Sequence, residues 1–246
     1  MHNIRNIVVL TGAGISAESG IPTFRTHGAV SYWEYDDADG VRKRHRVEDV
    51  CTPEALARDP DLVHRFYDLR RAALTGVGPH AAHMALARLD AEWHGELLIV
   101  TQNVDDLHER AGAKRLLHMH GELTSALCAV CDTRIRWPGP LPAETPCHSC
   151  TAPAMRPDIV FFGEMPYGMD QIERAIASYD LFVSIGTSGA VYPAAGFVQL
   201  ANAQGAETLE LNLEPSAGSS WFDESRLGAA SALVPTWVDE ILSAQQ

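Results

Sequence analysis

Four of the five cysteines stand in two close pairs, a spacing that could hold a metal ion. Cys128 and Cys131 are separated by two residues, fifteen residues follow, and Cys147 and Cys150 repeat the separation. Each such pair turns tightly enough to present two thiolates to one tetrahedral ion, as in structural zinc ribbons. Four protein ligands leave no open position, so we expect one structural Zn²⁺ and no catalytic metal. The alternative is four unliganded buried thiols, but the prolines and polar residues between the pairs leave little apolar sequence to fold without a metal.

A glycine turn follows the first apolar run of the chain. Residues 4–10 are rich in β-branched side chains and stop just before Gly12, which predicts a buried strand, a tight turn and then a helix. Gly12 and Gly14 would let the backbone approach a ligand closely, and free N–H groups of a first helical turn attract phosphate. Gly12-x-Gly14-x-x-Ala17 fits the dinucleotide fingerprint, but no carboxylate ends a clear second strand about 20 residues later. We therefore expect a nucleotide without the usual Rossmann ribose contact; a purely structural turn is the alternative.

A second group of polar residues directly follows the apolar run at 97–100. This group contains Gln102, Asn103 and Asp105. Three histidines are near in the sequence, namely His108, His118 and His120. An imidazole could serve as a general base, because it titrates near neutral pH. The residues alone do not select one of the three, and a purely structural role remains the alternative for each.

Helices alternating with buried strands must position these groups. We expect strands at residues 4–10, 97–100, 181–185, 208–213 and 232–234. Helices are expected at residues 62–74, 80–93, 170–178, 193–203 and 236–244. This alternation predicts an α/β fold with a Rossmann-like, doubly wound parallel sheet, whose ligands lie outside the carboxyl ends of the strands. Further polar or small residues stand at those ends, namely Gly186, Thr187, Ser188, Asn212 and Glu214.

Length and charge limit the function classes. With 246 residues and 46% hydrophobic content, the chain can form one domain with a smaller insertion. The net charge of −13 argues against a nucleic-acid binder and would suit basic protein tails. The sequence shows no secretion signal and no apolar segment long enough for a bilayer, so we expect a cytoplasmic enzyme that binds no membrane. Cys51 is expected to be a spare buried thiol.

The segment 26–46 carries neighbouring acidic and basic runs, which indicate a solvated local hairpin and not a docking site. Two helix starts follow it, because Thr52-Pro53 and Asp59-Pro60 each combine a capping residue with proline in the first turn. The segment therefore connects the glycine turn to a helical region.

At its longest motifs the chain resembles the sirtuins, which are NAD-dependent protein-lysine deacylases. The opening sirtuin motif GAGISxxSGIPxFR is matched at every fixed position by residues 12–25. The pattern QNxDxLHxxAG…xxHG is matched by Gln102, Asn103, Asp105, Leu107, His108, Ala111, Gly112, His120 and Gly121. Sirtuins also carry a zinc ribbon at this point of the chain. The resemblance covers nearly the whole chain and departs at residues 26–46, where Thr26-His27 replaces the usual glycine and the loop is longer.

The resemblance implies a site for NAD as co-substrate. His120 would be the general base, while Asn103 and Asp105 would hold the nicotinamide end and the ribose; His108 and His118 would then support the fold. The implied NAD contacts are Gly12, Ala13, Gly14, Ser16, Glu18, Ile21, Phe24, Arg25, Gln102, Asn103, Asp105, His120, Gly186, Thr187, Ser188, Asn212, Glu214 and Ala230.

The resemblance also implies a site for acylated lysine side chains of proteins. Residues 157–164 look like a strand and resemble the sirtuin segment that pairs with the substrate backbone, with contacts at Val160, Phe161, Phe162, Gly163 and Glu164. Tyr67 and Arg70 share a helix face. Taken alone they would be a packed aromatic and a solvated arginine, but in sirtuins this pair marks the branch that prefers succinyl and malonyl groups.

The expected function is therefore NAD-dependent removal of succinyl and malonyl groups, with weaker deacetylation, releasing nicotinamide and O-acyl-ADP-ribose. Two alternatives stay open: a mono-ADP-ribosyltransferase and a catalytically silent NAD-sensing scaffold. A hydride-transferring dehydrogenase is disfavoured by the missing ribose carboxylate. We expect one sirtuin-type domain over 1–246, with a Rossmann-like part at 1–31, 76–120 and 158–246, a helical and loop insertion at 32–75, and the zinc ribbon at 121–157.

Overall fold

The computed structural model describes residues 4–22, 32–37 and 39–245. The chain forms two compact units, which we call the large unit and the small unit. The large unit consists of the described parts of 1–23, 77–119 and 167–246, and the small unit of the described parts of 24–76 and 120–166. Residues 158–166, expected in the Rossmann-like part, group with the small unit, because strand β8 (Met155–Ile159) pairs with β6 (Gly121–Cys128). Within the described residues, no helix has the length and apolar character needed to cross a membrane.

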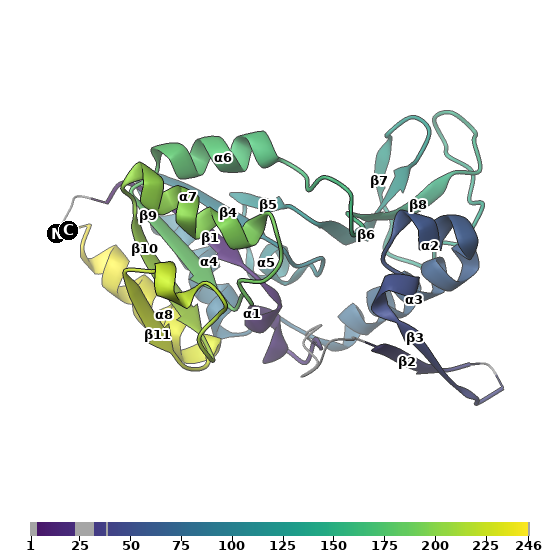
Figure 1. Cartoon of the computed structure of the whole chain (residues 1–246), viewed down its shortest axis with the longest axis horizontal. Helices are drawn as coiled ribbons and strands as arrows, with labels where there is room; N and C mark the ends of the chain where they lie inside the picture. Colours follow the sequence, from purple (N-terminus) through teal and green to yellow (C-terminus); the bar gives the residue numbers. More distant parts are fainter. Residues whose placement is uncertain (1–3, 23–31, 38, 246) are drawn as a thin grey trace. The chain divides into compact units, whose positions relative to one another are not determined.

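The large unit contains one sheet of six parallel strands (Figure 1). In spatial order they are β11 (Glu224–Leu227), β10 (Glu207–Asn212), β9 (Leu181–Ile185), β1 (Asn6–Thr11), β4 (Glu96–Thr101) and β5 (Leu116–His118). The central strand β1 pairs with β4 on one side and β9 on the other, so that Val9 is in register with both Ile99 and Val183. After β1 the chain adds β4 and β5 on one side and then β9, β10 and β11 on the other. The carboxyl end of β1 is therefore the topological switch point, where ligands bind in open α/β sheets.

Helices cover both faces of this sheet, as the doubly wound prediction requires. Ile7 and Val9 pack into the core formed with α4 (Ala81–Glu92) and α8 (Ala230–Ser243). Val8 and Leu10 point to the opposite face, which α6 (Met169–Ser178) and α7 (Phe197–Gln204) cover together in Figure 1. Successive strand residues face opposite sides, so a run that is apolar at every position can only be a strand buried on both faces.

Two of the expected elements in the large unit differ from the structure, and two of its strands were not expected. Residues 232–234, expected to be a strand, lie inside α8, where Val234 is fully buried against the sheet. The helix expected from 193 begins at Phe197, after a 3-10 turn at Ala194–Gly196. The sheet ends in two short strands that the sequence did not indicate, β5 and β11, and three to four residues carry too little periodicity to be distinguished from a loop.

The small unit contains a three-stranded antiparallel sheet in the order β7 (Arg134–Arg136), β6, β8. The expected hairpin within 26–46 is confirmed, since β2 (Tyr32–Asp36) pairs with β3 (Arg42–Arg46). Both helix starts are confirmed as well. Thr52 accepts a hydrogen bond from the Ala55 N–H (3.1 Å) ahead of α2 (Pro53–Arg58), and Asp59 accepts one from the Leu62 N–H (3.0 Å) ahead of α3 (Pro60–Ala73).

The remaining short elements of the two units are Val47–Asp49, Leu74–Gly76, α1 (Ala13–Ala17), α5 (Leu107–Ala111) and Ser219–Trp221.

Candidate active site

The turn between β1 and α1 packs directly on the backbone at the end of β9. The Gly12 N–H donates to the Ile185 carbonyl (3.0 Å), and the Gly14 N–H donates to the Gly186 carbonyl (2.8 Å). A Cβ atom added to Gly14 would lie 2.7 Å from the Gly186 Cα, and one added to Gly186 would lie 2.4 Å from the Ile15 nitrogen. The glycines are therefore needed because two backbones meet here with no room for side chains. The turn is held at the carboxyl edge of the sheet.

Asn103, Asp105 and Ser16 come together beside this turn. The Asn103 side-chain amide donates to the Gly12 carbonyl and to the Ser16 hydroxyl, both at 3.1 Å. Burial raises the pKa of Asp105, although hydrogen bonds from the Leu107 N–H and from Ser16 act in the opposite direction. The structure therefore brings an amide and a carboxylate together with a hydroxyl from a distant part of the chain. Ser16 and Asn103 are 87 positions apart in the sequence.

Three histidines lie near this group: His83 and His108 are buried and His80 is half-buried. His80 and His83 were not anticipated from the sequence. His83 Nε2 lies 3.5 Å from the Ser16 hydroxyl, and its ring centroid is 5.1 Å from that of His108. His108 Nε2 lies 3.1 Å from the Thr11 hydroxyl, which fits the expected structural role. His80 Nε2 lies 2.6 Å from the Ile15 carbonyl. The signal available in the sequence was the spacing of His80 and His83, which puts both on one side of a helix start.

His118 and His120 belong to different units. His118 lies in the large unit, with Nδ1 3.0 Å from the Asn103 carbonyl and Nε2 2.7 Å from a Glu109 carboxylate oxygen. His120 is half-buried and belongs to the small unit, where its backbone carbonyl accepts a hydrogen bond from the Val160 N–H (2.9 Å). The chain thus passes from one unit to the other at the residue that the sequence motif marks as the general base.

The residues expected near the adenosine half of NAD gather at the ends of β9 and β10. The Asn212 side-chain amide donates to the Thr187 carbonyl (2.7 Å), and the Thr187 hydroxyl is 2.8 Å from that of Ser184. The Ser188 carbonyl accepts a hydrogen bond from the Ala217 N–H (3.0 Å), and Glu214 is exposed. These bonds tie the loops after the two strands to each other.

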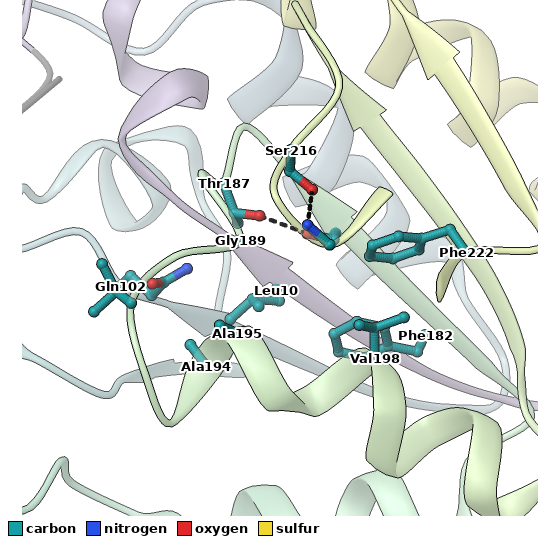
Figure 2. A pocket seen from close by; sticks show the side chains of 13 residues that line it. Leu10, Gln102, Phe182, Thr187, Gly189, Ala194, Ala195, Val198, Ser216 and Phe222 are labelled. Carbon is teal, nitrogen blue, oxygen red and sulfur yellow. Dashed lines mark hydrogen bonds between the residues drawn. The ribbon is translucent and has the colours of Figure 1, made fainter. Parts of the chain in front are cut away.

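A small cavity lies beside Thr187 at the carboxyl ends of β1, β4 and β9 (Figure 2). Gln102 and Thr187 supply polar groups to its wall, while Leu10 and Phe182 supply apolar surface. Gln102 is anchored through its backbone N–H, which donates to the Thr11 carbonyl (2.9 Å). The polar residues expected at the strand ends therefore do share one edge of the sheet.

Two residues near the end of the glycine motif, Glu18 and Ile21, form hydrogen bonds within the large unit. The Glu18 carboxylate accepts hydrogen bonds from the Ser231 N–H (3.0 Å) and the Ser231 hydroxyl (2.5 Å) at the first turn of α8. Burial acts to raise the pKa of Glu18, but these hydrogen bonds outweigh it and the pKa is lowered. Ala230 is the first residue of α8, and the Ile21 N–H donates to the Ser16 carbonyl (3.3 Å). Phe24 and Arg25 lie outside the described residues.

The four cysteines of the two pairs converge in the small unit. Their sulfur atoms all lie within 4.8 Å of one another, with Cys128 to Cys150 at 3.6 Å and Cys131 to Cys147 at 3.7 Å. Four thiolates around Zn²⁺ at about 2.3 Å would be about 3.8 Å apart, whereas a disulfide would require about 2 Å. The cysteine cluster therefore fits one tetrahedral zinc ion. Ala126, Leu141 and Met155 pack around Cys128 and Cys147 as a small core.

The strand expected over residues 157–164 ends at Ile159, and the rest of the segment is a turn. The Glu164 N–H donates to the Phe161 carbonyl (3.0 Å), and the Glu164 carboxylate accepts the Phe161 N–H (2.7 Å). Arg156 donates to the same carboxylate from two nitrogens, at 2.7 and 2.9 Å. These bonds close the chain on itself, which is why it leaves the sheet. We call residues 160–164 the substrate turn; Arg156, which shapes it, was missed in the sequence.

Tyr67 and Arg70 lie on α3 next to the substrate turn of the same unit. Tyr67 is 3% exposed, its ring stacks on that of Phe161 at 5.8 Å, and its hydroxyl donates to the Cys51 sulfur (3.4 Å). Burial raises the pKa of both Tyr67 and Cys51, and the nearby charge of Arg70 acts against this in each case. The spare thiol expected at Cys51 is thus buried against the Tyr67 hydroxyl, with the Arg70 charge close to both.

Removing the metal tests the cysteine cluster. We expect Cys147→Ser, or treatment with a strong chelator, to release one zinc per chain and lower the melting temperature by about 10 °C or more, because structural zinc binding contributes directly to folding. Elemental analysis and thermal unfolding measure both effects. Cys51→Ser is the matched control and should keep its zinc. A chelated protein that melts at the original temperature would contradict a structural role for the metal.

Acid should destabilise the protein through its buried histidines. Burial lowers the pKa of His83 to about 3 and that of His108 to about 4, whereas an unfolded histidine titrates near 6.5. Below about pH 6.5 the unfolded chain therefore binds more protons than the folded chain, and the free energy of unfolding falls by about 3 kcal/mol by pH 5. Urea unfolding at pH 7.5, 6.5 and 5.0 measures this loss. His83→Gln should roughly halve it, and a flat profile over this range would exclude the linkage.

Comparison with known proteins gives the family. A model of the Sir2 family matches residues 12–193. The NAD-dependent protein deacylase of Vibrio vulnificus (strain YJ016) is 54% identical over 242 residues, covering 97% of this chain and 94% of that protein. The solved structure of a Sir2 homologue–NAD complex is 33% identical, with a TM-score of 0.85, covering 99% of this chain and 92% of that one. A Sir2 homologue mutant with 2′-O-acetyl-ADP-ribose is 32% identical, with a TM-score of 0.83, covering 99% and 94%. With the parallel sheet, the four-cysteine cluster and these matches together, the chain belongs to the Sir2 family.

Proposed function

We propose that this protein removes succinyl and malonyl groups from lysine side chains, and acetyl groups more weakly, with release of nicotinamide and O-acyl-ADP-ribose. The coarser activity follows from the family: the protein is an NAD-dependent protein deacylase, like the curated relatives that it matches over nearly its whole length. The acyl preference is supported by one observation: α3 carries both Tyr67, whose hydroxyl donates to the Cys51 sulfur, and Arg70, whose charge acts to lower the pKa of that thiol.

The chemistry of these two side chains favours an acidic acyl group. A guanidinium offers parallel N–H donors to a carboxylate, and such charge-assisted pairs are about twice as strong as neutral hydrogen bonds. An acetyl group ends in a methyl, which can accept a hydrogen bond from neither the Tyr67 phenol nor the Arg70 guanidinium. The terminal carboxylate of a succinyl or malonyl group can accept hydrogen bonds from both side chains.

Residues of the large unit, together with His120 of the small unit, would act on the NAD co-substrate. NAD supplies a glycosidic bond to nicotinamide, which breaks when the acyl oxygen attacks the ribose carbon. Asn103 and Asp105, held beside the Gly12 turn through Ser16, would bind the nicotinamide end and the ribose. His120 would take a proton from a ribose hydroxyl, because a neutral imidazole can act as a general base. The hydroxyl oxygen would then bond to the acyl carbon, and water would complete the release of the lysine amine and O-acyl-ADP-ribose. The Sir2 homologue complex with 2′-O-acetyl-ADP-ribose supports the assignment of an O-acyl product.

The substrate turn would bind the peptide around the acylated lysine. Four of its backbone N–H groups already have acceptors: Val160 donates to the His120 carbonyl, Phe161 to the Glu164 carboxylate, Phe162 to the Cys51 carbonyl and Glu164 to the Phe161 carbonyl. Pairing with a peptide would therefore use the carbonyl groups of the turn and the Gly163 N–H. Phe162 is 57% exposed and would add apolar contact. Because these are mostly backbone contacts, we expect little selectivity for the neighbouring side chains.

The test of the proposed function is nicotinamide release from NAD with matched succinyl-, malonyl- and acetyl-lysine peptides. We expect faster release with the two acidic acyl groups than with acetyl. Labelled NAD distinguishes the alternatives. Label in a soluble acyl-ADP-ribose supports deacylation, label retained on protein supports mono-ADP-ribosyl transfer, and undiminished NAD supports a silent NAD-sensing scaffold.

Replacing Arg70 tests the acyl preference. Arg70→Met keeps the length of the side chain but removes its charge and donors, so kcat/KM for the succinyl peptide should fall about 100-fold, in line with the loss of a charge-assisted pair. The acetyl reaction should change only about twofold. Arg65→Met on the same helix is the matched control, because Arg65 is exposed and stacks on Tyr35. Equal losses on both peptides would show that Arg70 does not read the carboxylate.

Replacing His120 tests the general base. His120→Tyr should abolish product formation while the zinc content and the unfolding midpoint stay near those of the unaltered protein, because the side chain is only half-buried. Turnover is measured by product analysis, with the exposed His94→Tyr as control. A folded His120→Tyr variant that still deacylates would remove this residue from the mechanism.

A further inference from the structure

His118 contacts the start of the loop between β4 and α5 and the helix α5 that follows the loop. The loop runs over residues 102–106 and carries Asn103 and Asp105. His118 is the last residue of β5, in register with Thr101 at the end of β4. Its Nδ1 meets the backbone carbonyl of Asn103 (3.0 Å), where the loop begins, and its Nε2 meets Glu109 in α5 (2.7 Å), just after the loop ends.

Both partners of the His118 ring can only accept hydrogen bonds. A backbone carbonyl has no proton to give, and a carboxylate in an ion pair has none either. Each ring nitrogen must therefore carry a proton, which makes the ring an imidazolium. The side chain is 8% exposed, so these two bonds take the place of water.

We propose that His118, as a doubly protonated imidazolium, is a positioning residue that fixes Asn103 and Asp105 for the nicotinamide half of NAD. This inference rests on the proposed role of those two residues and goes beyond the general supporting role expected for His118. His118 touches no part of the substrate in this assignment. It acts through the backbone of the loop.

The loop depends on such fixation because it contains no helix or strand of its own. At its start, the Asn103 N–H donates to the Thr101 hydroxyl (3.0 Å), and the Asn103 side chain reaches the Gly12 carbonyl and Ser16. A small displacement of the Asn103 backbone would break both side-chain bonds. β5 is only three residues long, so the side chain of its last residue is a main link between the sheet edge and the loop.

An imidazolium at His118 would act on the titratable groups around it. Burial acts to raise the pKa of Glu109, but the hydrogen bond and the charge of His118 outweigh it and lower the pKa. Burial raises the pKa of Asp105, and the His118 charge is among the groups that oppose this rise. The same charge helps to lower the pKa of the neighbouring His108, after the larger effect of burial. A positive ring is thus placed between carboxylates and beside a neutral histidine.

The first test is the charge state of the ring in the unaltered protein. Nitrogen NMR of protein labelled in its histidine rings, assigned with His118→Gln, should show protons on both His118 nitrogens at pH 7. This measurement does not depend on turnover. A neutral His118 ring with a single protonated nitrogen would overturn the proposal.

The second test separates the two halves of the co-substrate. For His118→Phe, which keeps a ring but has no donors, we expect the Kd for NAD to rise about tenfold and the Kd for ADP-ribose, which lacks nicotinamide, to change less than twofold. Glu109→Gln, a milder change that keeps an acceptor, should show the same pattern with a smaller rise. An unchanged Kd for NAD, or an equal loss for both ligands, would overturn the positioning role.

A matched control breaks an ion pair near the other end of the same strand. Asp90 binds the Arg115 side chain (2.6 Å) and the Arg115 N–H (3.1 Å), directly before β5. Asp90→Asn should lower stability yet leave the ratio of the two Kd values unchanged, and a shifted ratio would overturn the assignment to His118. If the unaltered protein bound no NAD, the proposed function would fail, while the NMR result would still decide the charge of His118.

Discussion

The large unit depends on one close approach of two backbones. The turn after β1 and the end of β9 meet at Gly14 and Gly186, where a single added Cβ would collide with main-chain atoms. This contact lies at the switch point of the sheet, where β1 has β4 on one side and β9 on the other. It fixes the Gly12 carbonyl, which in turn holds the Asn103 side chain. A steric requirement of the fold thus sets the position of an amide that the proposed chemistry needs.

Around this turn, the protein buries polar groups that must be paired or neutral. Ser16 lies within hydrogen-bonding distance of both Asn103 and His83, and the carboxylate of Asp105 is kept close by. His83 and His108 are held neutral by burial, since an unpaired charge there would cost several kcal/mol. His118, whose ring meets two acceptors, is the charged exception. Histidine is therefore neutral at two positions of this site, His83 and His108, and charged at a third, His118.

Within the small unit, the part around the four cysteines holds short polar segments on a small core. The cysteine cluster provides a metal site where apolar packing is limited to a few residues such as Leu141 and Met155. The pair Arg156–Glu164 folds the substrate turn, and α3 places Tyr67 against it. The groups proposed to bind the acyl chain and the peptide thus lie on elements that also stabilise this unit.

The sequence by itself determined the features that depend on local pattern or long motifs. The buried strands, the two capped helix starts, the cysteine spacing and the family could all be read from it, because periodicity, capping and ligand spacing are properties of neighbouring residues. Tertiary structure decided the rest. It placed residues 232–234 in a helix and ended the strand at Ile159 through Arg156 and Glu164. It also brought His83 to Ser16 and His118 to the Asn103 carbonyl. These outcomes rest on contacts between residues far apart in the chain, whose energies no local pattern contains.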